Sequence, residues 1–324
     1  MARPRSIDKV LVIARGPLGP FVLALAAMRR IRAAHPKAQI SLLTTPPHEA
    51  LGRACPYVDR VDPDGEPEGF GDWRALIGRL RAARFDRAYD LDGSAWTSRL
   101  FQLLRPFPPP WSGSAFGCAL PHRNPARKSM HPLERHADQL KAAGIWPDAP
   151  TAPGAAPPPD ASWIGARTLG PRAQPRPHVV LAPGPKAEAD RGGWPIRAYG
   201  ELAHALRVQG YDVVVIGGPD DASLAQAIQH RAQARDLTGR TDYAQVAALC
   251  ARAALAIGAD YGFLHLAAAA GAPTLALMAK SADPRRLAPR GHVAVLQADD
   301  LAQLGVAEVL RAAERLAPPL QKTM

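Results

Sequence analysis

Cysteine, aromatic residues and long apolar runs are all scarce in this chain of 324 residues. The three cysteines, Cys55, Cys118 and Cys250, stand far apart and form no CxxC pair, which argues against a disulfide framework or a cysteine metal site. Aromatic residues make up 6% of the chain and are not interleaved with the basic ones, unlike the pattern of single-strand binders. We therefore expect a protein of the reducing cytoplasm with no nucleic-acid partner.

Export signals and membrane spans are also missing from the sequence pattern. The first apolar stretch is interrupted by three charged residues and resembles a strand followed by a helix. Between Asp260 and Lys280 lie 19 uncharged residues, a length that approaches a membrane span. Because His265 and a Gly-Ala-Pro break interrupt them, we expect a turn between buried elements instead.

Positive charge is plentiful but uneven. The formal net charge is +11, of which +8 falls in residues 1–150. Such a field favours an anionic partner, for example a phosphorylated glycolipid at a membrane surface. The alternative is an Arg-rich composition whose charges only solvate the surface, and the charge balance alone does not separate the two.

Short apolar runs alternate with segments of helical periodicity along the chain, which predicts an α/β fold with parallel sheets. The expected strands are 10–14, 39–44, 58–61, 178–182, 213–216, 255–258, 274–278 and one that ends at Asp92. The expected helices are 21–34, 73–82, 94–104, 131–143, 195–209, 221–231, 243–252, a short one from 47 and one from about 263.

A Pro-rich segment divides the chain. Residues 147–160 read P-D-A-P-T-A-P-G-A-A-P-P-P-D, which cannot pack a core and predicts an extended connection. The strand-helix alternation restarts beyond it. We therefore predict two Rossmann-like domains, 1–155 and 156–324, that face each other across a cleft, with ligands beyond the carboxyl ends of the strands.

The segment Asp260–Pro273 carries the most specific signal. It reads D-Y-G-F-L-H-L-A-A-A-A-G-A-P and follows the buried run 255–258. Gly262 lets the backbone approach a ligand, and a helix that starts near Phe263 would offer free amides to a diphosphate. Strand-turn-helix units of this kind occur in many α/β proteins, so the segment alone leaves the function open.

The spacing D-x-G-x-x-H-x-A-x-A-x-G-x-P resembles the C-terminal signature of the lipopolysaccharide heptosyltransferases, glycosyltransferase family 9. Further segments match in order and spacing: V-L-V-I-A-R-G-P-L-G-P, F-D-R-A-Y-D-L-D-G-S, A-P-G-P, W-P, G-G-P and L-T-G. The resemblance implies the GT-B fold, an N-terminal acceptor domain and a C-terminal nucleotide-sugar domain. It also implies transfer of heptose from an ADP-sugar to a lipopolysaccharide core, by an inverting mechanism without cofactor or metal, at the cytoplasmic face of the inner membrane.

The same resemblance supplies candidate positions for the donor. Asp260, Gly262 and His265 would grip the diphosphate, and Tyr261 stands where the family has a small hydroxyl residue. The family's lysine falls at Gly192, so nearby charges would have to replace it, and Asp221 falls at the ribose-binding position. The full predicted set is Gly184, Lys186, Arg191, Asp221, Asp260, Tyr261, Gly262, Phe263 and His265. The alternatives are solvated loop charges for Lys186 and Arg191, a helix cap for Asp221, and a backbone-ordering role for His265.

The catalytic base is the largest departure from the family. An inverting transfer needs a carboxylate or imidazole to accept the acceptor's proton. The family's base follows the first loop, where this chain has Pro20, expected as the first residue of a helix. Asp92 is the candidate replacement, with helix capping as its alternative and as the preferred role of Asp90.

Two other functions stay open. The departures at Pro20, Gly192 and Tyr261 also fit a degenerate member that binds nucleotide sugar or glycan without turnover. An NAD-dependent oxidoreductase is disfavoured, because the first loop, G-P-L-G, lacks the G-x-G-x-x-G pattern.

Overall fold

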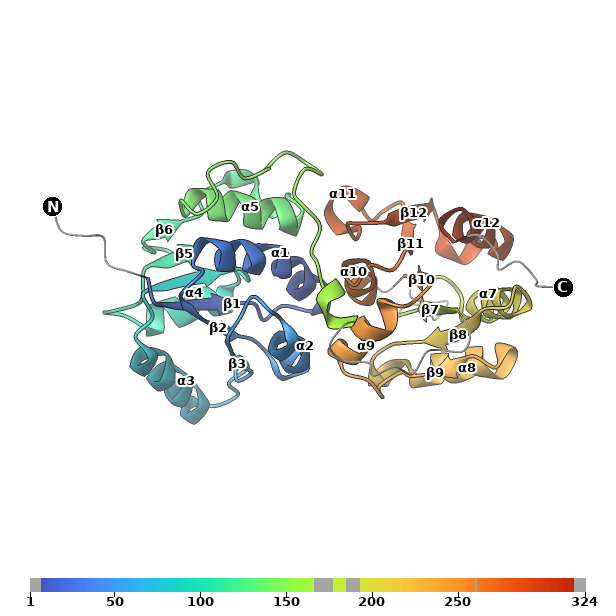
Figure 1. Cartoon of the computed structure of the whole chain (residues 1–324), viewed down its shortest axis with the longest axis horizontal. Helices are drawn as coiled ribbons and strands as arrows, with labels where there is room; N and C mark the ends of the chain where they lie inside the picture. Colours follow the sequence, from blue (N-terminus) through green and yellow to red (C-terminus); the bar gives the residue numbers. More distant parts are fainter. Residues whose placement is uncertain (1–6, 166–176, 185–192, 260, 318–324) are drawn as a thin grey trace. The chain divides into compact units, whose positions relative to one another are not determined.

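The computed structural model describes residues 7–165, 177–184, 193–259 and 261–317. The chain divides into two compact units, residues 1–158 and 159–324, and the division falls inside the Pro-rich segment 147–160. Figure 1 shows that each unit has a parallel sheet with helices packed against it, as the alternation of strands and helices predicted.

Unit 1 contains a six-stranded sheet in the order β3-β2-β1-β4-β5-β6, with every neighbouring pair parallel. The strands are β1 (Lys9–Ile13), β2 (Gln39–Leu43), β3 (Arg60–Asp62), β4 (Arg87–Asp90), β5 (Trp111–Gly113) and β6 (Leu120–Pro121). The helices are α1 (Leu18–Ala34), η1 (Pro46–His48), α2 (Glu49–Ala54), α3 (Phe70–Ala83), α4 (Ala95–Leu103), η2 (Pro125–Lys128) and α5 (Pro132–Ala142).

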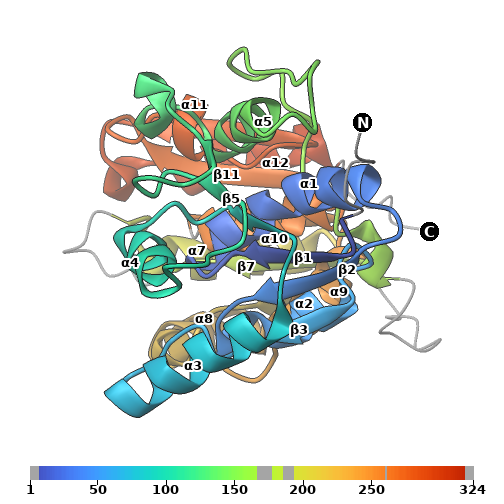
Figure 2. The same cartoon turned by 90° about the vertical axis from the view of Figure 1, so that its left-hand side faces the viewer.

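Strand alternation divides the helices of unit 1 between the two faces of the sheet. Leu11 and Ile13 point to the face covered by α3 and α4, where they join a buried cluster around Trp111. Helices α1 and α5 pack side by side, which Figures 1 and 2 both show. The carboxyl edge of the sheet is left to loops.

Unit 2 repeats this arrangement with the strand order β12-β11-β10-β7-β8-β9, again fully parallel. The strands are β7 (His178–Ala182), β8 (Asp212–Val215), β9 (Arg235–Asp236), β10 (Leu255–Gly258), β11 (Thr274–Ala279) and β12 (Val293–Ala298). The helices described are η3 (Ser162–Ile164), α7 (Ile196–Val208), η5 (Pro219–Asp221), α8 (Ala222–Ala232), α9 (Tyr243–Cys250), α10 (Tyr261–Ala269), α11 (Pro284–Leu287), η6 (Leu301–Gln303) and α12 (Val306–Leu316).

Trp194 anchors one face of the second core. Its ring is fully buried, packs edge-on against Tyr199 at 4.6 Å, and donates a hydrogen bond of 2.9 Å from Nε1 to the carbonyl of Leu304. A buried indole N–H needs such a partner. This one bond joins the segment before α7 to the segment before α12.

The strand order creates a switch point in each sheet. In unit 1 the chain winds outward from β1 in one direction and from β4 in the other, so their carboxyl ends flank a crevice, with Ile13 beside Asp90. In unit 2 the corresponding strands are β7 and β10, with Ala182 beside Gly258. Ligands of open α/β sheets bind at such points.

Several elements were not predicted, and some boundaries were wrong. Strands β5, β6, β9 and β12 and helix α12 were missed, because very short or edge strands carry little periodic signal. Helix α10 begins at Tyr261 and not near Phe263. Pro20 is the third residue of α1 and not the first, although its missing N–H is still one of the unpaired donors of the first turn.

Within the described ranges no helix combines the length and the apolar character needed to cross a bilayer. The uncharged stretch that follows Asp260 instead folds as α10 and β11, joined by a turn at Gly271 with a φ of +101°. The expected turn between buried elements is confirmed.

Two buried histidines should make unit 1 sensitive to acid. Burial lowers the pKa of His136 to about 3, and burial lowers that of His48 to about 4. An unfolded histidine has a pKa of about 6.5, so below that pH the unfolded chain binds protons that the folded chain refuses. The stability is therefore complete above pH ~6.5 and is lost as the pH falls toward the folded values. Burial raises the pKa of Asp90 to about 6, which acts in the opposite direction as the pH falls.

We expect His136→Gln to flatten this acid dependence. Between pH ~6 and ~4 the free energy of unfolding of the variant should change less steeply, by about 1.4 kcal/mol per pH unit. Urea unfolding at a series of pH values measures the slope. His230→Gln, at an exposed position, is the control and should keep the original slope. An unchanged slope in His136→Gln would contradict the assignment.

Candidate functional site

The loop after β1 places Arg15 at the switch point of unit 1. Its Nε donates to the carbonyl of Gly65, its guanidinium lies 3.5 Å from the centre of the Trp96 ring, and its Nη1 is 3.7 Å from Oδ2 of Asp92. The side chain is 11% exposed. Burial lowers the pKa of Arg15, and the Asp92 carboxylate acts in the opposite direction. Three different contacts therefore fix one cation beside the candidate base.

The two oxygens of Asp92 have different surroundings. Oδ2 accepts a hydrogen bond of 3.0 Å from Oγ of Ser94 and faces Arg15. Oδ1 makes no hydrogen bond within the described residues and is not a buried atom. It lies 3.2 Å from the point where a Cβ on Gly16 would stand, and the Cβ of Pro20 lies equally close to that point. The structure thus brings an accessible carboxylate oxygen to the start of α1.

Neither aspartate caps α4 in the usual way. Ser94 is the N-cap, and its Oγ accepts from the amide of Thr97 at 3.2 Å. Asp90 is fully buried, and its Oδ1 accepts from the amide of Gly93 at 2.8 Å. The predicted capping role of Asp90 is therefore a bracing of the turn that carries Asp92.

Helix α5 fixes the same turn from the other face of the sheet. Nε2 of His136 is 3.0 Å from the Leu91 carbonyl, a contact that requires the ring to donate. Nε2 of Gln139 donates to the carbonyls of Asp90 at 2.9 Å and Ser112 at 3.1 Å. The ends of β4 and β5 are therefore held in register, which limits how far Asp92 can move.

The switch point of unit 2 lies between β7 and β10. Gly184 follows β7 with a φ of +73°, a left-handed conformation that glycine adopts most easily. A Cβ on Gly258 would stand 2.0 Å from the carbonyl oxygen of Ala182, so the two backbones approach too closely for any side chain. Of the predicted donor residues, Lys186, Arg191 and Asp260 lie outside the described residues.

Helix α10 places its predicted residues in two groups. Tyr261 and Gly262 form its first turn and are half-buried, and burial raises the pKa of Tyr261. Phe263 and His265 are turned inward, 8% and 6% exposed, and Phe263 packs edge-on against Tyr243 at 6.0 Å. The burial of His265 favours its ordering role over one that reaches a ligand directly.

Asp221 lies beyond the carboxyl end of β8, the strand next to β7. Its Oδ2 accepts from the amide of Gly218 at 2.8 Å, so the side chain closes the turn before α8 and does not cap that helix itself. Its Oδ1 has no hydrogen bond among the described residues, and burial raises the pKa of the carboxyl group. One oxygen is committed to the turn, and the other has no partner.

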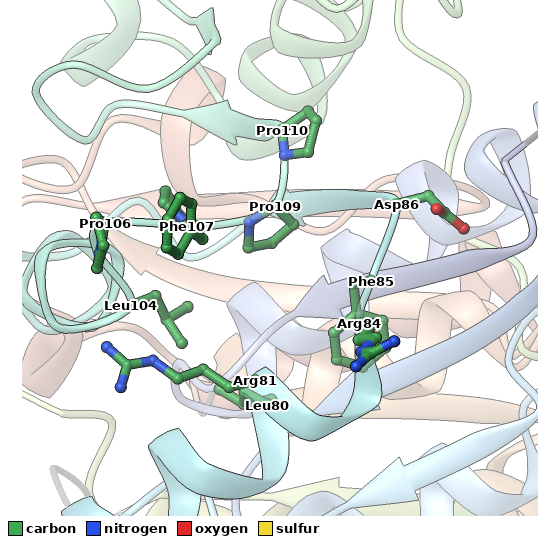
Figure 3. Close-up of a pocket in the computed structure, with 11 residues that line it drawn as sticks. Leu80, Arg81, Arg84, Phe85, Asp86, Leu104, Pro106, Phe107, Pro109 and Pro110 are labelled. Atoms are coloured by element: carbon green, nitrogen blue, oxygen red, sulfur yellow. The ribbon is translucent and has the colours of Figure 1, made fainter. Parts of the chain in front are cut away.

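Two further searches bear on the site. No group of three or more His, Cys, Asp or Glu in the described ranges could hold a metal ion. A groove of about 520 Å³ opens in unit 1 where β4 and β5 begin (Figure 3), the opposite edge of the sheet from Asp92. It is lined by Leu80, Arg81, Arg84, Phe85, Asp86, Leu104 and residues 106–110.

Comparisons with known proteins agree on one group. The sequence pattern of glycosyltransferase family 9 (heptosyltransferase) matches residues 73–298. Lipopolysaccharide heptosyltransferase 2 of Escherichia coli is 28% identical, over 88% of this chain and 86% of its own length. The solved ADP-heptose lipopolysaccharide heptosyltransferase II of E. coli superposes with a TM-score of 0.78, at 24% identity, over 95% of this chain and 98% of that one. An E. coli heptosyltransferase solved with ADP has a TM-score of 0.76, at 19% identity, over 95% of this chain and 100% of that one.

Proposed function

The chain belongs to glycosyltransferase family 9, and from this we propose that it transfers heptose from an ADP-linked donor to a lipopolysaccharide core or a related anionic glycan. The observation that carries the proposal is the pair of switch points, one with a carboxylate and one with a glycine turn and a helix start. Proteins of similar sequence bear the name lipopolysaccharide heptosyltransferase 2.

Unit 2 is proposed as the donor-binding unit. The diphosphate would lie against the first turn of α10 and the turn at Gly184, where free amides and the helix dipole attract an anion. Asp260, Lys186 and Arg191 are proposed as its further contacts from their positions in the family pattern. Oδ1 of Asp221, which has no partner in the described chain, is proposed to accept from a ribose hydroxyl.

Unit 1 is proposed as the acceptor-binding unit, with Asp92 as the base. Pro20 would occupy the family's base position, and Oδ1 of Asp92 lies beside the same turn. In the reaction the acceptor hydroxyl oxygen attacks the anomeric carbon while its proton passes to Oδ1. The bond between that carbon and the donor phosphate breaks, and its electron pair leaves with ADP. Attack opposite the leaving group inverts the anomeric centre.

We further propose that the enzyme works at the cytoplasmic face of the inner membrane, as a peripheral protein. Its formal charge of +11 favours an anionic surface and an anionic acceptor. No metal or organic cofactor is required, since charge on the leaving diphosphate can be balanced by amides and basic side chains.

The test combines turnover with binding. Purified protein is given ADP-heptose and a lipopolysaccharide core acceptor, and ADP release is measured together with the calorimetric affinity for ADP. The proposal expects release that depends on the acceptor. Binding of ADP without release would favour the degenerate, non-catalytic alternative that the proline at position 20 suggests, and no ADP binding would refute the donor site.

A further inference from the structure

Two arginines beside Asp92 have no function in the mechanism above. Arg135 lies on α5 and Arg127 on η2. The guanidinium of Arg135 makes no hydrogen bond or ion pair within the described residues, although it is half-buried. The charges that act on it are the nearby carboxylates of Asp92 and Asp90, which attract it, and Arg127, which repels it.

Arg127 is held only at one end of its guanidinium group. Its Nη2 donates a long hydrogen bond of 3.4 Å to the carbonyl of Gly93, and this nitrogen lies 2.8 Å from the position of a Cβ on Gly93. Its Nε is buried and has no partner in the described chain. A buried N–H without an acceptor costs about 1 to 3 kcal/mol, so an arginine placed this way calls for an explanation.

The carboxylates around these arginines are already engaged. Asp92 faces Arg15, and Asp90 accepts from the Gly93 amide. On α5 itself, Glu134 accepts from the amide of Gly154 at 2.9 Å, and Asp138 accepts from His122 at 2.7 Å and Asn124 at 2.8 Å. Two positive charges beside the switch point therefore lack a dedicated counter-charge.

From this geometry we infer that Arg127 and Arg135 form an anion-binding subsite for an acidic group, carboxylate or phosphate, on the acceptor sugar. A guanidinium group presents parallel N–H donors that match the oxygens of either anion. The site lies next to the turn that carries Asp92, so an acid held there would orient a neighbouring hydroxyl of the same sugar toward the base. The inference rests on the proposed function, since it assigns the acceptor to unit 1.

Binding without turnover tests the subsite. The affinity of the full chain for glucuronate and for glucose 6-phosphate is measured by NMR titration, with glucose as the uncharged reference and ADP as the donor probe. We expect both Arg135→Gln and Arg127→Gln to weaken binding of at least one sugar acid about tenfold or more and to leave ADP affinity unchanged. The sugar acid that binds more tightly identifies the preferred acidic group.

Matched variants separate this subsite from general effects of charge and folding. Arg84→Gln removes the same charge from an exposed position at the opposite edge of unit 1 and should bind the sugar acids like the original chain. Arg135→Lys keeps the charge without the planar fork and should lose an intermediate amount. Equal losses in Arg84→Gln, a parallel loss of ADP affinity, or no binding of either sugar acid by the original chain would overturn the inference. Because no ADP-heptose is used, an inactive enzyme would refute the proposed function without deciding this test.

Discussion

Replacing Asp92 by asparagine should lower kcat for sugar transfer by about 10²- to 10⁴-fold, the usual contribution of a general base. The amide has nearly the shape of the carboxylate and can still accept from Oγ of Ser94, but it cannot take the acceptor's proton. The donor would bind in unit 2, so its KM should change little. Initial rates of ADP release, measured over a range of donor and acceptor concentrations, separate these constants.

A second variant tells the chemical role of Asp92 from a structural one. Asp62→Asn also removes a carboxylate from an arginine pair, since Asp62 lies 3.3 Å from Arg79. Exposed pairs of this kind contribute little to stability, so this variant should keep full activity. If Asp92→Asn retains the original kcat, or loses activity only in step with its thermal stability, Asp92 is not the base.

The architecture was predictable because its signals are local. A buried strand followed by glycine and an amphipathic helix states its own period, and repetition of that unit implies a parallel sheet. Strand β10 was located correctly at 255–258 for this reason. Strand β5 was not, because its three residues include a glycine and it belongs to the sheet only through its pairing with β4.

The candidate site was predictable only where it follows a strand. Asp92 was found because it ends an apolar run, and the structure adds that its Oδ1 is the accessible oxygen. Arg15 ends a strand too and could have been noticed by the same signal. Arg127 and Arg135 could not, because an irregular segment and the packing of α5 bring them there across more than thirty residues of chain. Contacts of that kind depend on the tertiary fold.

Gly258→Ala should be the most damaging single methyl group in unit 2. Its Cβ would stand 2.0 Å from the Ala182 carbonyl oxygen, and both atoms belong to paired backbone in the centre of the sheet. Neither strand can move without disturbing its other neighbour, so we expect a loss of about 3 kcal/mol or more in the free energy of unfolding. That corresponds to a fall of roughly 6 to 12 °C in Tm, measured by calorimetry.

The same substitution should also weaken ADP binding, because β10 leads directly into the loop and helix α10 that are proposed to hold the diphosphate. Gly305→Ala is the matched control in unit 2: a Cβ there meets nothing within 4 Å, so stability should change by less than about 1 kcal/mol. Measuring ADP affinity well below the lowered Tm separates local displacement from unfolding. If folded Gly258→Ala protein bound ADP as tightly as the original chain, the close approach of β7 and β10 would matter for stability alone, and the diphosphate would have to be held away from this switch point.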